Sequence, residues 1–130
     1  MSASLSVVIP AYNEAARMGK TLRAVVDYLS QNTPDSEVIV VDDGSSDHTA
    51  DLARQVFQDS KGLRTSVISY KSNLGKGRAV RLGLLAARSD VALFSDADLS
   101  TPITEAPKLV DPIVNGSAMS LSDRARSIEN

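Results

Sequence analysis

The sequence contains no cysteine and no tryptophan. Without cysteine, the chain can form neither disulfides nor thiolate metal sites, and redox chemistry does not indicate its compartment. No apolar run approaches the ~18 residues that a membrane-spanning helix needs. Residues 1–14 also lack the basic and long apolar regions of a signal peptide. We therefore expect a cytoplasmic protein, with peripheral attachment at the cytoplasmic face of the membrane as an alternative.

Three familiar motifs are missing as well. Residues 74–77, LGKG, lack the GxxxxGKS or GxxxxGKT spacing of a P-loop. Gly75 and Gly77 begin a GxG, but Val80 stands where a dinucleotide fingerprint has its last glycine. No GxSxG exists, and the single histidine, His48, falls at the start of an expected helix, where a surface position is expected. These absences argue against a P-loop nucleoside triphosphatase, a dinucleotide-binding enzyme with the GxGxxG fingerprint and a serine hydrolase.

Charge and length set further limits. Lys and Arg total 14 against 16 Asp and Glu, so the net charge is −2 and gives no reason to expect nucleic acid as a partner. A chain of 130 residues with 42% hydrophobic residues is long enough for one globular domain with a core. We expect a single domain over residues 1–130, with residues 122–130 as a frayed tail.

Strand and helix patterns alternate along the chain. The expected strands cover residues 6–9, 37–41, 65–70, 91–95 and 117–121, and Pro10 is expected to stop the first. The expected helices cover residues 14–31, a segment after Asp47, a segment from the 73–77 loop to about Arg88, and a segment from about Thr104 that Pro112 would kink or shorten. This β-α-β-α-β-α-β-α-β order predicts an α/β fold, with a mostly parallel sheet flanked by helices on both faces.

Polar residues cluster where these strands end. In parallel sheets, ligands bind at the carboxyl ends of the strands, near the switch in strand order. The residues at these ends are Tyr12, Asn13 and Glu14 after the first strand, Asp42 and Asp43 after the second, Lys76 after the third, and Asp96 and Asp98 after the fourth. Acidic residues at two strand ends of one sheet indicate a ligand site.

The stretch VALFSDADLSTP (91–102) holds two carboxylates one residue apart, Asp96 and Asp98. In extended backbone, residues two apart point the same way, so both side chains can face one ligand. Hard oxygen donors of this kind suit Mg²⁺ or Mn²⁺ shared with a diphosphate. A solvated acidic turn is the alternative for the motif taken alone.

Four segments carry a family resemblance: SVVIPAYNEA (6–15), EVIVVDDGSSDHTA (37–50), NLGKGRAVRLGLLAA (73–87) and VALFSDADLSTP (91–102). In order and spacing, they resemble the N-terminal, nucleotide-sugar-binding half of family-2 glycosyltransferases with the GT-A (Rossmann-like) fold. The GKG and DADLSTP motifs are most similar to those of polyprenyl-phosphate transferases, especially dolichyl-phosphate β-glucosyltransferases. Related mannosyltransferases usually carry Gln where this chain has Ser100.

The resemblance implies roles for residues after the first two strands. Pro10 and Tyr12 match positions that line the base pocket, where an aromatic ring can stack on the base. Glu14 matches a nucleotide-contacting glutamate, although an acid at a helix start is favourable without a ligand. Asp43 matches the carboxylate that accepts a hydrogen bond from the ring N–H of uracil or guanine. Asp42 is a weaker contact candidate that can instead hold the turn.

The resemblance also assigns the later residues. Asp96, with Ala97, matches the DXD position near the ribose and the sugar, and Asp98 matches the ligand of the divalent ion, Mg²⁺ or Mn²⁺. Lys76 is expected near the nucleotide, with a solvated lysine as the equally weighted alternative. Arg124 aligns loosely with a family arginine that usually follows Gly-Ser.

The implied function is metal-dependent, inverting transfer of a sugar from a nucleotide sugar, UDP-glucose, to a polyprenyl or dolichyl phosphate. The alternatives are a GDP-mannose-dependent mannosyltransferase, a non-catalytic nucleotide-binding half-domain and, more distantly, a receiver-type signalling domain. Family enzymes continue with acceptor-binding segments, so the resemblance implies a truncated GT-A domain. We also expect self-association through an uncovered edge of the sheet.

Overall fold

The structure, a computed structural model, describes residues 4–60, 62–89, 91–95 and 118–120. These residues form a five-stranded sheet in which every pairing is parallel. The strands are β1 (Leu5–Ala11), β2 (Glu37–Asp43), β3 (Arg64–Tyr70), β4 (Val91–Phe94) and β5 (Ala118–Ser120). The predicted α/β fold with a parallel sheet is confirmed.

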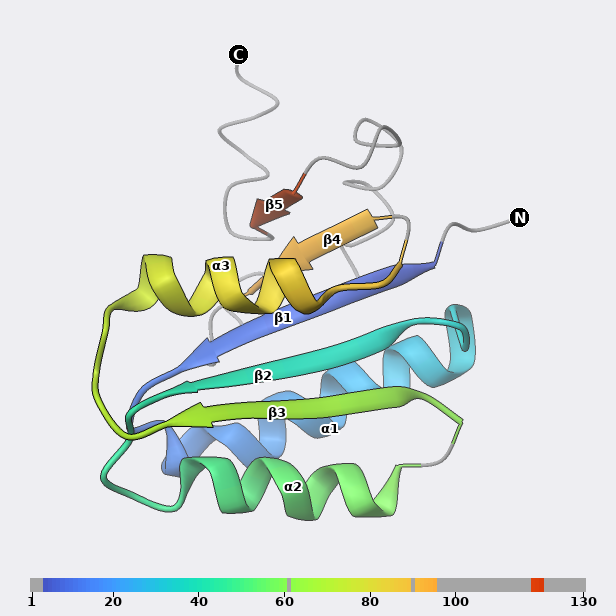
Figure 1. The fold of residues 1–130 in the computed structure, drawn as a ribbon. Helices are drawn as coiled ribbons and strands as arrows, with labels where there is room; N and C mark the ends of the chain where they lie inside the picture. The colour runs from blue at the N-terminus through green and yellow to red at the C-terminus, as the bar shows by residue number, and fades with distance from the viewer. Residues whose placement is uncertain (1–3, 61, 90, 96–117, 121–130) are drawn as a thin grey trace, which may run out of the picture.

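Three helices connect the first four strands: α1 (Ala15–Asn32), α2 (Thr49–Asp59) and α3 (Lys76–Ala86). Figure 1 shows α1 and α2 on one face of the sheet and α3 on the other, as the alternating pattern predicts. The expected fourth helix and the tail at residues 122–130 lie outside the described residues. Within the described ranges, no helix is long and apolar enough to cross a membrane.

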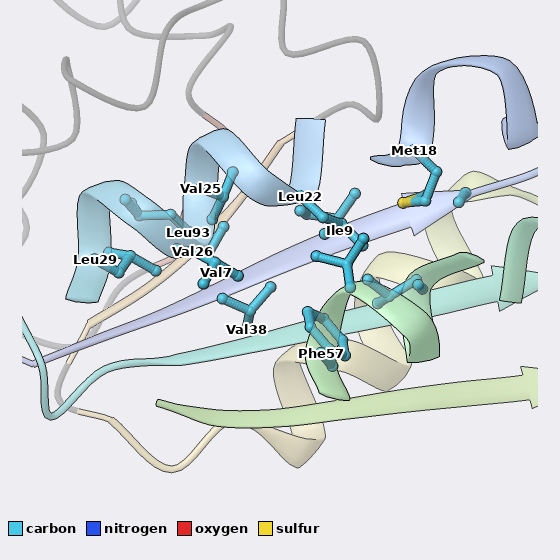
Figure 2. Packing of buried hydrophobic residues seen from close by; sticks show 14 of the residues in the cluster. Val7, Ile9, Met18, Leu22, Val25, Val26, Leu29, Val38, Phe57 and Leu93 are labelled. Atoms are coloured by element: carbon cyan, nitrogen blue, oxygen red, sulfur yellow. The ribbon is translucent and has the colours of Figure 1, made fainter. Parts of the chain in front are cut away.

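Two hydrophobic clusters hold the layers together. Figure 2 shows the larger cluster, in which side chains of β1 and β2 meet those of α1 and α2, among them Ile9, Val38, Leu22 and Phe57. Successive residues of a strand point to opposite faces, so Val8 belongs to the smaller cluster, under α3. Burial on both faces explains why β1 and β2 read as continuous apolar runs rather than alternating ones.

Pro10 does not end β1, contrary to the expectation from the sequence. The strand continues through Ala11 in register with β2. The carbonyl of Val8 accepts a hydrogen bond from Ser95 N (2.9 Å), so the backbone groups of Val8 face β4. Alternate residues face the same neighbour, so Pro10 also faces β4, whose pairing with β1 ends at Phe94. The N–H that proline lacks therefore leaves no ladder position unpaired.

The strand order is β3-β2-β1-β4-β5. Receiver domains have the order 2-1-3-4-5 instead. The receiver-type alternative is therefore wrong. Among the described strands, β3 and β5 form the two edges, and self-association through an edge stays a prediction.

Candidate functional site

The switch in strand order lies between β1 and β4. The chain first builds outward through β2 and β3, and then returns to add β4 on the other side of β1. Ligand crevices of open α/β sheets form outside the carboxyl ends at such a point. Ser95 is the last described residue after β4, and it is buried. Asp96, Ala97, Asp98 and Arg124 lie outside the described residues, so their predicted roles stay predictions.

Asp43, the last residue of β2, is the centre of the described part of the edge. The residue is 3% exposed. Its Oδ1 accepts hydrogen bonds from the Tyr70 hydroxyl (2.7 Å) and from Leu74 N (2.8 Å). Its Oδ2 accepts hydrogen bonds from Gly75 N (3.0 Å) and from Asn73 Nδ2 (3.1 Å). One carboxylate thus binds the end of β3 and the loop that leads to α3.

These four hydrogen bonds use the acceptor capacity of the Asp43 carboxylate. A carboxylate offers about four lone-pair sites, and all four are taken by donors of the chain itself. To accept a base N–H, Asp43 must release a donor, and the side chains of Tyr70 and Asn73 can move more easily than the backbone. Base recognition by Asp43 stays a prediction, and the structure adds a second role, which is to hold the loop before α3.

Tyr70 is the hydroxyl partner of Asp43 and lies opposite it in the β2–β3 register. Burial raises the pKa of Tyr70, and the hydrogen bond to Asp43 and its negative charge raise it further, to about 12. The positive charge of Arg78 lowers the pKa of Tyr70 in part. The hydroxyl therefore stays protonated, as a donor to Asp43, throughout the physiological range.

We expect one of the three tyrosines to ionise late in an alkaline titration. Because the pKa of Tyr70 is raised to about 12, the stabilisation from its O–H is complete below about pH 10 and is lost as the pH rises through about 12. Ultraviolet absorbance of tyrosinate should show a late step that Tyr70→Phe removes and Tyr28→Phe retains. A late step that survives Tyr70→Phe would contradict the assignment.

The loop after β1 is tied to the turn after β2 through Asn13. Asn13 N donates to Ser45 Oγ (2.8 Å), and Asn13 Oδ1 accepts from Ser46 N (2.9 Å). Asn13 has a φ of 52°, a left-handed conformation that asparagine tolerates better than most residues. The two loops therefore form one unit beside Tyr12.

The start of α1 is capped by this same turn. Glu14 N donates to Thr49 Oγ1 (2.9 Å), and Ala15 N donates to Asp47 Oδ2 (3.2 Å). Asp47 also accepts hydrogen bonds from the backbone and the hydroxyl of Thr49. Burial raises the pKa of Asp47, but the hydrogen bonds from Thr49 and Ala15 outweigh it and leave the pKa below its ordinary value.

Gly44 brings the second and third loops into contact. Its φ is 74°, and a Cβ at this position would lie 2.4 Å from the carbonyl carbon of Ser72 and 2.5 Å from Asn73 N. Only glycine fits such a backbone-to-backbone approach. The loops after β1, β2 and β3 thus converge at one edge, as the sequence analysis predicts.

The other predicted residues differ in their surroundings. Pro10 is buried within β1, whereas Tyr12 is 48% exposed and is not a core residue. Asp42 is buried; its Oδ1 accepts from Ser45 N (3.0 Å) and its Oδ2 from Ser69 Oγ (3.3 Å), so it holds the turn. Glu14 is the N-cap residue of α1, with its carboxylate 3.6 Å from Arg17 Nε. Lys76 is the first residue of α3 and is exposed.

A divalent cation does not fit the described carboxylates alone. Within the described ranges, there is no cluster of three His, Cys, Asp or Glu side chains that could hold a metal. Asp42 and Asp43 both already accept hydrogen bonds from the chain. The predicted Mg²⁺ or Mn²⁺ site at Asp98 lies outside the described residues and stays a prediction.

The sequence analysis missed three residues of this edge: Tyr70, Asn73 and Asp47. Tyr70 and Asn73 were expected only as a strand end and part of a loop, and Asp47 only as the residue before the second expected helix. Their signal was position, because each follows or ends a predicted strand at the carboxyl edge. Pairing Tyr70 and Asn73 with Asp43 required the register of β2 and β3, and pairing Asp47 with Ala15 required β1 beside β2.

Comparison with known protein families shows which family this chain belongs to. The model of the family described as "Glycosyl transferase family 2" matches residues 6–130. The chain belongs to this family. Dolichyl-phosphate beta-glucosyltransferase of Saccharomyces cerevisiae is 36% identical over 113 residues, which cover 84% of this chain and 34% of that protein. This family-2 chain therefore spans about a third of the length of that relative.

Solved structures support the same assignment. The mannosyltransferase PcManGT from Pyrobaculum calidifontis, in complex with GDP-Man and Mn²⁺, matches 75% of this chain and 28% of that chain, with a TM-score of 0.67 and 27% identity. Glucosyl-3-phosphoglycerate synthase from Mycobacterium tuberculosis, in complex with Mn²⁺, UDP and phosphoglyceric acid, matches 89% and 40%, with a TM-score of 0.64 and 32% identity. The predicted resemblance to family-2 glycosyltransferases of the GT-A fold is confirmed.

Proposed function

We propose that this chain binds a nucleotide sugar at the carboxyl edge of its sheet. It would form the donor half of a metal-dependent, inverting glycosyltransferase acting on polyprenyl or dolichyl phosphate. The observation that carries the proposal is the convergence of the loops after β1, β2 and β3 at the carboxyl edge, beside the switch point between β1 and β4: Asn13 binds the turn after β2, and Asp43 binds the loop before α3. The named activity of the Saccharomyces cerevisiae relative supports the acceptor class.

UDP-glucose is the favoured donor, and GDP-mannose is the alternative. A carboxylate such as Asp43 only accepts hydrogen bonds, so it favours uracil or guanine over cytosine but does not separate the first two. The relative is named a glucosyltransferase, and Ser100 stands where related mannosyltransferases usually have Gln. Both points favour glucose.

The side chains would divide the work on the donor. The exposed ring of Tyr12 would stack on the base, with Pro10 behind it and Glu14 beside the nucleotide. Asp98 would hold Mg²⁺ or Mn²⁺, which would supply a Lewis acid to stabilise charge on the departing diphosphate, and Asp96 would lie near the ribose and the sugar.

The acceptor requires no base from this chain. A lipid-linked phosphate is already an anion near neutral pH, so it can attack the anomeric carbon without being deprotonated. The residues of this chain would bind and orient the donor, with Lys76 and Arg124 as the candidate cations beside the phosphates and Ala97 as a backbone contact.

We expect isothermal calorimetry to detect metal-dependent binding of UDP and UDP-glucose to this chain. Asp98→Ala should weaken binding in Mn²⁺ by about 10- to 100-fold, the range typical for loss of a group that supports a metal site. Asp27→Ala, which removes an exposed acid on α1, is the matched control and should leave binding unchanged. GDP and GDP-mannose, tested in parallel, separate the two donors. Absence of metal-dependent binding of either nucleotide would refute the proposal.

A non-catalytic nucleotide-binding half-domain is the second candidate. It shares the nucleotide-binding edge with the first candidate and differs from it only in lacking transfer. A transfer assay with radiolabelled UDP-glucose and a polyprenyl phosphate separates the two. Binding without transfer would favour the second candidate, and formation of a glycolipid would exclude it.

A further inference from the structure

Positive charge is concentrated in one segment of the chain. Residues 60–89 contain no Asp or Glu but hold half of the 14 Lys and Arg residues: Lys61, Arg64, Lys71, Lys76, Arg78, Arg81 and Arg88. The rest of the chain carries all 16 acidic residues. The net charge of −2 therefore conceals a strongly basic region that comprises β3, the following loop and α3.

The outer face of α3 displays part of this charge. The inner face is defined by Ala79 and Gly83, which are buried against β1 and β2. Arg78, Arg81 and Leu85 lie on the opposite side and are exposed, Leu85 by 74%. Of the described residues, none forms an ion pair with Arg78 or Arg81.

Leu74 is a second exposed leucine, in the loop just before α3. Its side chain is 50% exposed, although its backbone N–H donates to Asp43 Oδ1 and the next N–H, of Gly75, donates to Oδ2. The Asp43 hydrogen bonds thus hold an apolar side chain in solvent. Arg78, Arg81 and Leu85 share the outer face of α3, and Leu74 is exposed in the loop just before the helix; we name these four residues the basic-leucine face.

We propose that the basic-leucine face docks this protein on an anionic lipid bilayer. Exposed leucines can enter the boundary between headgroups and acyl chains, and arginines between them can pair with lipid phosphates. A site for a water-soluble anion would need the arginines but not the exposed leucines, and a purely apolar contact would need the leucines but not the arginines. Both features together match an interfacial surface.

Nucleic acid is the other anionic macromolecule to weigh against a bilayer. Sites for single strands usually stack bases on exposed aromatic rings. The only aromatic residue of segment 60–89 is Tyr70, whose hydroxyl is bound to Asp43. The face therefore favours lipid over nucleic acid.

Docking by this face would orient the candidate site. α3 starts at the carboxyl edge of the sheet, and Leu74 adjoins the Asp43 cluster through its own N–H. A bilayer in contact with the face would lie beside that edge, where a lipid-linked phosphate would be presented. The docking goes beyond the proposed function and does not depend on it, because it can be measured without nucleotide.

Sedimentation with vesicles tests the docking on this chain. We expect binding to vesicles of equal parts phosphatidylcholine and phosphatidylglycerol, and weak binding to phosphatidylcholine alone. Arg78→Gln with Arg81→Gln should lower the partition coefficient about 25-fold, at about fivefold for each arginine near an anionic surface. Leu85→Gln should lower it about tenfold through lost apolar burial, and its high exposure means that folding is not at stake. Salt at about 1 M, where the Debye length is about 3 Å, should weaken binding strongly.

The matched control is Lys20→Gln with Arg23→Gln, which makes the same charge change on the exposed side of α1, across the sheet. It should change partitioning by less than about threefold, because these charges lie more than a Debye length from the docked surface. Equal losses in both double variants, or equal binding to both vesicle types, would overturn the proposal. Displacement by a single-stranded DNA oligonucleotide together with no effect of Leu85→Gln would overturn it in favour of nucleic acid.

Discussion

Replacing Asp43 by asparagine is expected to lower the free energy of unfolding by about 2–4 kcal/mol. The amide group of asparagine is a donor, so at one of the two oxygen positions it would face two donors of the chain. These are either the Tyr70 hydroxyl with Leu74 N, or Asn73 Nδ2 with Gly75 N. Each buried donor left without an acceptor costs about 1–3 kcal/mol. Shape is conserved in this substitution, so the loss isolates the hydrogen bonds from packing.

Urea unfolding at neutral pH measures this effect. Asp59→Asn, at the exposed end of α2, makes the same chemical change without the buried contacts and should shift stability by less than about 0.5 kcal/mol. Equal stability of the Asp43 variant and the Asp59 control would mean that the 73–75 loop does not depend on the carboxylate. Nucleotide affinity should also fall for Asp43→Asn, since the same loop positions Lys76.

Gly83→Ala is expected to destabilise the protein by about 1–3 kcal/mol, the usual cost of overpacking a core. A Cβ at position 83 would lie 2.2 Å from Cγ1 of Val8 and 3.2 Å from Cγ2 of Val41. Both are stiff β-branched side chains in central strands, so α3 itself must move away from the sheet. The normal gain of about 1 kcal/mol for alanine over glycine in a helix reduces the loss without reversing it.

Gly77→Ala provides the control within the same helix. A Cβ at Gly77 meets nothing within 4 Å, so only the helix propensity changes. Stability should stay equal or rise by up to about 1 kcal/mol. Thermal melts of the two variants should therefore shift in opposite directions, and a parallel shift would show that α3 does not pack as closely as the structure indicates.

Most of the fold follows from local patterns. The run EVIVV at residues 37–41 predicts a buried strand, and β2 begins at Glu37 as expected. Met18, Leu22, Val25 and Leu29 recur at helical spacing, and all four are buried in α1. Pro10 is the exception: its effect depended on which neighbour its missing N–H faced, and that is set by pairing with β4 rather than by adjacent residues.

For the candidate site too, the sequence predicted the positions of residues but not the contacts between them. The sequence placed Tyr12, Glu14, Asp42, Asp43 and Lys76 after strands, and the parallel sheet brings these positions to one edge. It did not show that Asp43 binds Tyr70 and the loop before α3, because these contacts join residues 27 to 32 positions apart. Nor did it show that Asp47 caps α1, a contact across 32 positions.

By itself, the sequence determined the element types, the α/β class and the family, because periodicity and motif spacing are properties of neighbouring residues. Only the tertiary structure decided which strands are neighbours, that the carboxylate of Asp43 is filled by the chain's own donors, and that Leu74, Arg78, Arg81 and Leu85 are exposed. Strand order and register set these relations, and they arise from packing between distant segments, which local patterns do not encode.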